Sequence, residues 1–269
     1  MQIDVRGRRV GYDDTGGSRV PLVLLHGFPL DRTIWSAQVR GLADVARVVA
    51  PDLRGFGESA GAPGRPGVAG TTMDDYAAEV AALLDALDLP RAVVGGVSMG
   101  GYVAMAFHRA FAGRLRGLVL VDTRAGPDSA EARAARDASA ALARAEGVSA
   151  VAAQSIGKML TPENARPDAP MRRALSDLMG AQPVEGVVAA LGAIRDRPDS
   201  GPSIARIAVP TLVVCGIEDA LIPPTESEAL RDAIPGARLA LIAGAGHLPN
   251  FEQPEAFNRV VRAFLASIA

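Results

Sequence analysis

The stretch VVGGVSMGG, residues 93–101, decides the fold of this 269-residue chain. It reads as a buried strand, a glycine-rich sharp turn and the first residues of a helix, with Ser98 at the apex. Small residues at Gly96 and Gly100 let the strand and the helix approach closely, while the apex residue takes a strained backbone conformation. The pattern is typical of a nucleophile elbow and predicts that the Ser98 hydroxyl projects outward.

The residues around this turn favour the same interpretation. Residues 91–94 form a short apolar strand, and residues 102–111 are apolar and free of Gly and Pro, as a helix below the elbow should be. A dinucleotide-binding turn would need Gly-x-Gly-x-x-Gly, and no register of this stretch supplies it. A tight turn with an incidental serine is the alternative that the motif alone leaves open.

A serine hydroxyl needs a base that removes its proton, and the chain has three histidines. His108 lies ten residues along the same predicted helix, about 15 Å away, so it cannot reach Ser98, and we expect it at the surface or its boundary. His26 follows the apolar residues 22–25 and is a possible base by residue type. His247 lies in a glycine-rich loop that we expect to be flexible, after the apolar residues 239–242. The order serine, acid, histidine along the chain favours His247 as the base.

The acid that orients the base should leave a strand between Ser98 and His247. Asp219 stands just past the carboxyl end of a predicted strand at residues 212–215, and it is the leading candidate. Glu218 is the neighbour that would compete. Asp122, at the end of residues 117–121, is a second possible location, although an aspartate there is also typical of a turn cap.

Together these residues resemble the α/β-hydrolase fold superfamily. The chain is similar to its branch of 3-oxoadipate enol-lactonase-like esterases and lactonases. Residues 26–29, HGFP, match the oxyanion loop, and residues 51–59, PDLRGFGES, match the turn after the next strand. Residues 216–219 and 246–247 match the acid and base loops, so the resemblance covers essentially the whole chain.

The resemblance implies a structural role for His26 and a catalytic triad of Ser98, Asp219 and His247. It also implies that Phe28 and Met99 donate backbone N–H groups to the oxyanion. Acyl transfer needs two such donors aimed at the developing negative oxygen, and losing one costs roughly 3–4 kcal/mol.

The activity expected from this triad is hydrolysis of a small ester or lactone through an acyl-enzyme. Relatives with the same triad also catalyse seryl perhydrolysis, so that reaction stays open. A non-catalytic ligand-binding member of the fold is the alternative from another class. The serine disfavours haloalkane dehalogenase and epoxide hydrolase chemistry, because the relatives that perform it carry an aspartate at this position of the elbow.

The substrate is less well defined by the sequence. Arg124 follows a predicted strand at the edge where the cap meets the sheet, so it could bind a substrate carboxylate, as an enol-lactone acid would require. It could equally bond a cap helix or an acidic neighbour. Phe28, Trp35 and Met99 are expected to contribute to a largely hydrophobic pocket.

Composition sets further limits. The net charge is −2, with 28 basic and 30 acidic residues well mixed, which favours neither nucleic acid nor an acidic membrane as a partner. There is no run of eighteen apolar residues and no signal-peptide pattern, so a cytoplasmic location is expected. Cys215 is the only cysteine; it cannot form an internal disulfide and is expected in the core. We expect no metal and no cofactor, and the oligomeric state is not indicated.

The order of elements predicts an α/β fold: a mostly parallel eight-stranded sheet with covering helices and an inserted helical cap. The core would comprise residues 1–123 and 207–269, and the Ala- and Arg-rich residues 124–206 would form the cap. Residues 61–70, rich in Gly and Pro, are expected to be a mobile loop. Strands are predicted at residues 3–5, 8–12, 22–25, 47–50, 92–94, 118–121, 212–215 and 238–242. Helices are predicted at residues 34–43, 73–87, 99–110, 129–146, 148–159, 169–179, 183–194, 224–233 and 254–267.

Overall fold

The computed structural model describes residues 1–61 and 69–268, so residues 62–68 of the predicted loop at 61–70 lie outside the described residues. Eight strands form one sheet, each at a position where the sequence predicts one. Their bounds are β1 Gln2–Val5, β2 Arg8–Asp14, β3 Pro21–Leu25, β4 Arg47–Pro51, β5 Ala92–Val97, β6 Leu115–Val121, β7 Thr211–Gly216 and β8 Arg238–Ile242.

The sheet has the order β1-β2-β4-β3-β5-β6-β7-β8. Along this order from β4 to β8, which includes β3, each strand is parallel to its neighbours. At the other edge, β1 pairs antiparallel with β2, and β2 pairs antiparallel with β4. Because the last four strands in this order are parallel, the loops that follow β5, β6, β7 and β8 all open at the same edge of the sheet. The chain therefore has the predicted α/β-hydrolase architecture.

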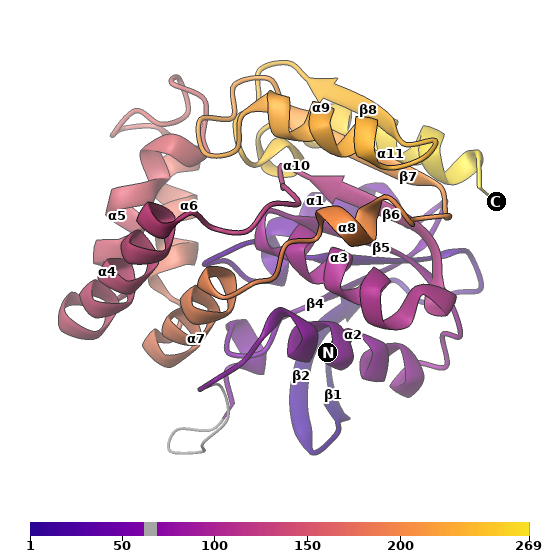
Figure 1. Cartoon of the computed structure of the whole chain (residues 1–269), viewed down its shortest axis with the longest axis horizontal. Coiled ribbons are helices and arrows are strands. Elements are labelled where there is room, and N and C mark those ends of the chain that lie inside the picture. The colour runs from indigo at the N-terminus through magenta and orange to yellow at the C-terminus, as the bar shows by residue number, and fades with distance from the viewer. Residues whose placement is uncertain (62–68, 269) are drawn as a thin grey trace.

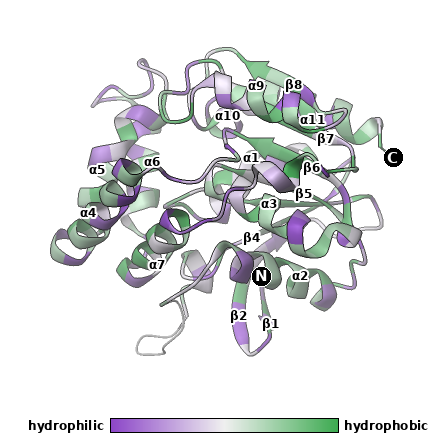
Figure 2. Cartoon of the chain, in the orientation of Figure 1, coloured by the Kyte–Doolittle hydropathy of each residue, from purple (hydrophilic) through white to green (hydrophobic). Residues whose placement is uncertain are grey.

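Helices cover both faces of the sheet (Figure 1). On one face lie α2 (Met73–Ala86), α3 (Met99–Phe111) and α9 (Pro224–Ala233), whose apolar side chains belong to one hydrophobic cluster. On the other face lie α1 (Ser36–Gly41) and α11 (Pro254–Ala266), which pack in a second cluster around Trp35 and Phe257. Figure 2 shows the central strands as the most hydrophobic part of the fold, as expected for strands buried on both faces.

Five helices stand between β6 and β7. They are α4 (Ala130–Glu146), α5 (Val148–Met159), α6 (Pro170–Gly180), α7 (Val184–Arg195) and the short α8 (Gly201–Ile204). The first four, called the cap helices below, lie together beside the sheet (Figure 1). That residues 124–206 form a separate subdomain stays a prediction. The sequence analysis predicted no helix at α8 or at α10 (Pro249–Glu252), each of which is four residues long.

Partly buried polar contacts join the connection between α6 and α7 to the rest of the fold. The Gln182 side chain donates to Asp31 Oδ2 at 3.1 Å and accepts from the backbone N–H of Gly57 at 3.0 Å. Close by, Gly186 lies directly against the carbonyl group of Gly55, leaving no space for a Cβ. The segment between β6 and β7 is thus fixed to two loops that belong to the first 60 residues.

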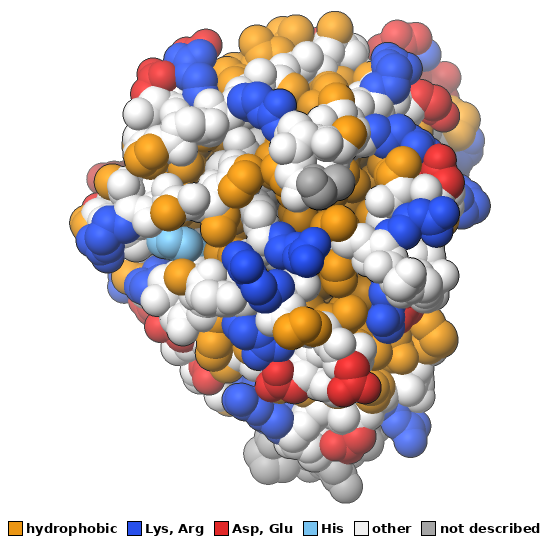
Figure 3. Space-filling model, turned by 90° about the vertical axis from the view of Figure 1, so that its right-hand side faces the viewer, with side chains coloured by type: hydrophobic (Ala, Val, Ile, Leu, Met, Phe, Trp, Pro, Cys, Tyr) orange, Lys and Arg blue, Asp and Glu red, His pale blue; other side chains and the backbone are white. Residues whose placement is uncertain are grey.

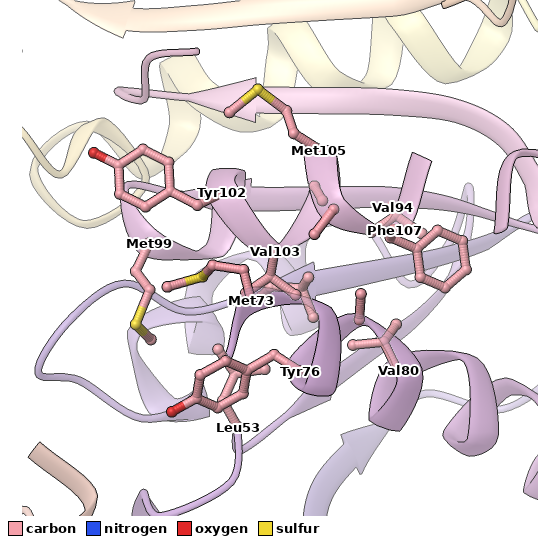
Figure 4. Close-up of a cluster of buried hydrophobic side chains, with 14 of the residues drawn as sticks. Leu53, Met73, Tyr76, Val80, Val94, Met99, Tyr102, Val103, Met105 and Phe107 are labelled. Carbon is pink, nitrogen blue, oxygen red and sulfur yellow. The ribbon is translucent and has the colours of Figure 1, made fainter. Parts of the chain in front are cut away.

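The glycines of the elbow are required by the packing of α3 under the sheet. A Cβ on Gly96 would collide with the backbone of Gly100, and a Cβ on Gly100 would collide with the carbonyl oxygen of Leu25. Figure 4 shows how α3 then packs: Met99 and Tyr102 lie across from Met73 and Tyr76 of α2. The predicted close approach of strand and helix is confirmed.

The surface carries charges of both signs. Figure 3 shows one face on which Lys and Arg lie among Asp, Glu and hydrophobic side chains, in keeping with the net charge of −2. Among the described residues, no helix has the length and apolarity to span a membrane. Cys215 is fully buried in β7, as predicted.

Candidate active site

Ser98 occupies the apex between β5 and α3. Its backbone has φ +55° and ψ −115°, a strained region for a residue with a side chain, which confirms the sequence prediction. Its N–H donates to the carbonyl of Val121 at 2.9 Å, and the Thr123 hydroxyl donates to its carbonyl at 2.9 Å. Its own hydroxyl makes no capping hydrogen bond to α3, so the side chain is not used to stabilise the helix.

Asp219 and His247 are brought together from the ends of β7 and β8. His247 Nδ1 lies 2.7 Å from Asp219 Oδ2, and both side chains are almost completely buried. The other oxygen, Asp219 Oδ1, accepts the backbone N–H groups of Leu221 at 2.8 Å and Ile222 at 3.0 Å. Burial alone would raise the pKa of Asp219, but His247 and these two N–H groups lower it below its ordinary value. Asp219 is therefore a carboxylate that holds His247 in the Nδ1–H tautomer.

This geometry leaves His247 Nε2 as the nitrogen available to another group. Ser98, Asp219 and His247 follow the carboxyl ends of the parallel strands β5, β7 and β8, which open at the same edge of the sheet. Within the described part of the chain, no hydrogen bond joins the Ser98 hydroxyl to His247. Such contacts often close only when substrate is bound.

The other two histidines have different environments. His26 is fully buried; its Nδ1 lies 2.8 Å from the Gly27 carbonyl, and its Nε2 accepts the N–H of Leu53 at 2.9 Å. Both ring nitrogens are occupied and burial lowers its pKa, so His26 organises its loop rather than acting as a base. His108 is 8% exposed, so of the two predicted positions the surface is excluded, and the residue lies just beneath it.

The structure also shows where the two alternative acids lie. Glu218 is exposed, whereas Asp122 is fully buried and lies close to the Asp219–His247 pair. One carboxylate oxygen of Asp122, one of Asp219 and a ring nitrogen of His247 lie within 4.8 Å of one another. Asp122 Oδ1 accepts the N–H of Gly216 at 3.0 Å. Burial and the negative charge of Asp219 raise the pKa of Asp122 well above its ordinary value, which favours the neutral form of Asp122 beside a charged Asp219.

The neutral state of Asp122 predicts a pH-dependent gain in stability for Asp122→Asn. In the unfolded chain Asp122 ionises near its ordinary pKa, so unfolding above that pKa releases a proton, and the contribution of Asp122 to wild-type stability falls as pH rises. Asparagine keeps an acceptor for the N–H of Gly216 and is neutral at every pH, so it does not carry this cost. Thermal melts should show the variant more stable than wild type at pH 7, with the difference vanishing near pH 4. A difference that stays constant over this range would contradict the neutral assignment.

Asp122, Asp219 and His247 are also residues that could hold a metal ion by type. However, Asp219 Oδ2 is bonded to His247, Asp219 Oδ1 accepts two backbone N–H groups, and the raised pKa of Asp122 favours its neutral form. These features fit a hydrogen-bonded acid and base better than a set of charged ligands.

The loop at residues 26–29 lies against the elbow. A Cβ on Gly27 would lie 3.3 Å from Ser98 Cβ and 3.2 Å from the Val97 carbonyl oxygen, so only glycine fits without displacing the elbow. This contact brings Phe28, which is partly buried, next to the elbow. Met99 is the first residue of α3, where backbone N–H groups have no partner within the helix. Both predicted oxyanion donors are thus close to Ser98. Met99 is its neighbour in the chain, and Phe28 is brought near it by the contact of Gly27 with the elbow.

The two predicted substrate-binding residues lie in contrasting surroundings. Trp35 is fully buried against Phe257, with ring centroids 5.8 Å apart, and its indole Nε1 has no partner among the described residues. The Arg124 guanidinium donates to Asp128 at 2.9 Å. Asp128 is completely buried and also binds Arg136 at 3.1 Å and Arg197 at 2.7 Å. Sequence reasoning did not predict Asp128 or Arg197.

Comparisons with known proteins show the family to which this architecture belongs. The sequence model of the alpha/beta hydrolase fold family matches residues 20–254, and the chain belongs to this family. An esterase from Thermogutta terrifontis, solved with malate bound, is 40% identical with a TM-score of 0.93, over 100% of this chain and 99% of that one. An enol-lactonase from Burkholderia xenovorans is 30% identical with a TM-score of 0.89, over 99% and 100% of the two chains.

A curated relative also indicates a similarity to enol-lactonases. The chain is 28% identical to 3-oxoadipate enol-lactonase 2 of Acinetobacter baylyi over 247 residues, which is 92% of this chain and 89% of the relative. Esterases, enol-lactonases and other hydrolases thus recur among the relatives and the solved structures, consistent with a carboxylic ester hydrolase.

Proposed function

We propose that the chain hydrolyses a small carboxylic ester or lactone through an acyl-enzyme on Ser98. The observation that carries the proposal is the buried 2.7 Å contact between His247 Nδ1 and Asp219 Oδ2, at the sheet edge where the strained Ser98 elbow opens. A buried carboxylate that fixes the tautomer of a histidine is what a serine nucleophile needs in order to lose its proton. The similarity to esterases and enol-lactonases supports the carboxylic ester as the substrate class.

In the proposed reaction, His247 Nε2 takes the proton of Ser98 while the serine oxygen attacks the carbonyl carbon. The N–H groups of Phe28 and Met99 donate to the oxyanion of the tetrahedral intermediate. The C–O bond to the leaving group then breaks as His247 gives the proton to the departing alkoxide. Water attacks the acyl-enzyme with His247 again as base, which releases the acid and restores Ser98. In a lactone the leaving alkoxide stays attached to the acyl group.

A substrate panel tests this proposal. Purified protein should turn over chromogenic short-chain esters or lactones, and a serine-directed phosphonate should label Ser98 alone. Hydrogen peroxide with acetate belongs in the same panel, because peracid formation would indicate perhydrolysis by the same serine. Absence of both turnover and labelling would instead indicate a non-catalytic member of the fold, and labelling of another residue would contradict the assignment of Ser98.

Arg124→Ala tests whether this arginine selects acidic substrates. Its guanidinium is held by Asp128, so we expect the KM values for acidic lactones and for neutral esters of similar size to change by the same factor. Arg136→Ala is the matched control, because Arg136 binds the other oxygen of Asp128. A selective rise in KM for the acidic lactones, on the order of 10- to 100-fold, would assign a substrate carboxylate to Arg124 instead.

A further inference from the structure

The loop that carries His247 is anchored, although the sequence predicts it to be flexible. The backbone N–H of His247 donates to the carbonyl of Met159, the last residue of α5, at 3.0 Å. The preceding Gly246 is packed so closely that an added Cβ would lie 2.9 Å from the Leu160 carbonyl carbon and 3.1 Å from the Thr161 nitrogen. The loop of the proposed base therefore rests on the segment that follows the cap helix α5.

Glu252 joins the same two segments through its carboxylate. It lies in α10, five residues after His247, and is only 6% exposed. Its Oε2 accepts the backbone N–H of Gly246 at 2.7 Å. Its Oε1 accepts the backbone N–H of Thr161 at 2.8 Å, the Thr161 hydroxyl at 2.9 Å and the Asn164 side-chain amide at 2.9 Å.

The two oxygens of Glu252 thus face different parts of the molecule. One oxygen holds the residue that precedes His247, and the other holds residues of the segment between α5 and α6. The four contacts are N–H or O–H donors, and they satisfy a buried carboxylate whose burial would otherwise be costly. Nothing in the proposed chemistry uses Glu252 directly, since its oxygens are occupied by these donors.

We propose that Glu252 is a positioning residue for His247. Its carboxylate holds the His247 loop in place against residues 159–164 and thereby couples the segment between α5 and α6 to the base. The inference rests on the proposed function, in which His247 is the base. Moving the loop would change how His247 meets both Asp219 and Ser98, and small displacements of a catalytic group reduce turnover strongly.

The substitution Glu252→Gln distinguishes the hydrogen bonds of Oε1 from the hydrogen bond of Oε2. A glutamine oxygen can still accept the three hydrogen bonds from Thr161 and Asn164, but its NH₂ group would then face the N–H of Gly246, donor against donor. We expect kcat for a short-chain ester to fall at least tenfold while KM changes less than twofold. Glu255→Gln is the control for charge, since Glu255 is exposed on α11, and it should leave both constants unchanged.

A spectroscopic measurement distinguishes positioning from a general loss of structure. The proton on His247 Nδ1, in its short bond to Asp219, should give a far-downfield proton resonance in wild type, and this resonance should move or broaden in Glu252→Gln. Should that variant not fold, Thr161→Val removes one donor to Oε1 with little change of shape. It should then show a loss of kcat of about threefold and a displaced resonance.

The results that overturn the inference differ from those that overturn the proposed function. Wild-type kcat, or a tenfold loss with an unchanged downfield resonance, in a folded Glu252→Gln protein would reject the positioning role while leaving the triad intact. Full activity of Ser98→Ala would reject the triad itself, whatever Glu252 does.

Discussion

Replacing Ser98 by alanine should reduce ester hydrolysis to less than a few per cent of the wild-type rate while the thermal unfolding temperature stays nearly unchanged. The hydroxyl is the attacking atom in the proposed reaction, and removing the nucleophile of a triad commonly lowers kcat by several orders of magnitude. The fold should tolerate the change, because the Ser98 side chain makes no capping bond to α3 and alanine leaves no large cavity.

The measurement is kcat for a chromogenic ester, with phosphonate labelling as an independent readout. Ser203→Ala is a suitable control, since Ser203 is a buried serine of α8 whose hydroxyl donates to the Ser200 carbonyl. Activity above a few per cent in Ser98→Ala would remove Ser98 from the mechanism.

The second large effect is expected for Asp219→Asn, which should lower kcat roughly 10⁴-fold, as loss of the triad acid does elsewhere. An asparagine in this place presents either an NH₂ group to His247 Nδ1, which favours the wrong tautomer, or an oxygen without the negative charge that stabilises the imidazolium. Protein stability should change little in comparison, since the Leu221 and Ile222 N–H groups can still donate to the amide oxygen.

Asp122→Asn is the matched comparison for Asp219→Asn, because both carboxyls lie at the same site and only their charge states and contacts differ. The raised pKa of Asp122 favours its neutral form, and its Oδ1 accepts the N–H of Gly216, so an amide in its place should keep most of the activity. If Asp122→Asn were the inactive variant and Asp219→Asn the active one, the acid would lie after β6 rather than after β7.

The sequence was most informative about features set by local pattern. The apolar runs predicted every strand of the sheet, and the glycines at 96 and 100 predicted the strained turn at Ser98. The sequence named Asp219 as the leading candidate for the acid but left Asp122 and Glu218 open, because all three follow strands that end at one edge. The choice depends on a distance across the sheet, and the structure gives that contact to Asp219.

The sequence was least informative about contacts between distant polar residues. Arg124 and Asp128 are four residues apart. Arg197, which completes their cluster, lies 69 residues after Asp128. Glu252 meets Thr161 over 91 residues, and no motif marks either residue. For the same reason the loop of His247 was expected to be flexible: its glycines are visible in the sequence, whereas the partners that hold it are not.

The contacts between the α6–α7 connection and the first 60 residues bear on how specificity could be altered by exchanging parts between related hydrolases. A transplanted segment between β6 and β7 would need a glutamine able to reach Asp31 and Gly57, and a glycine where Gly186 meets Gly55. A chimera lacking these partners would leave partly buried donors and acceptors unpaired on both sides of the junction and would lose the close packing of Gly186 on Gly55. Grafts that carry their contact residues along should therefore fold more often than grafts chosen by helix boundaries alone.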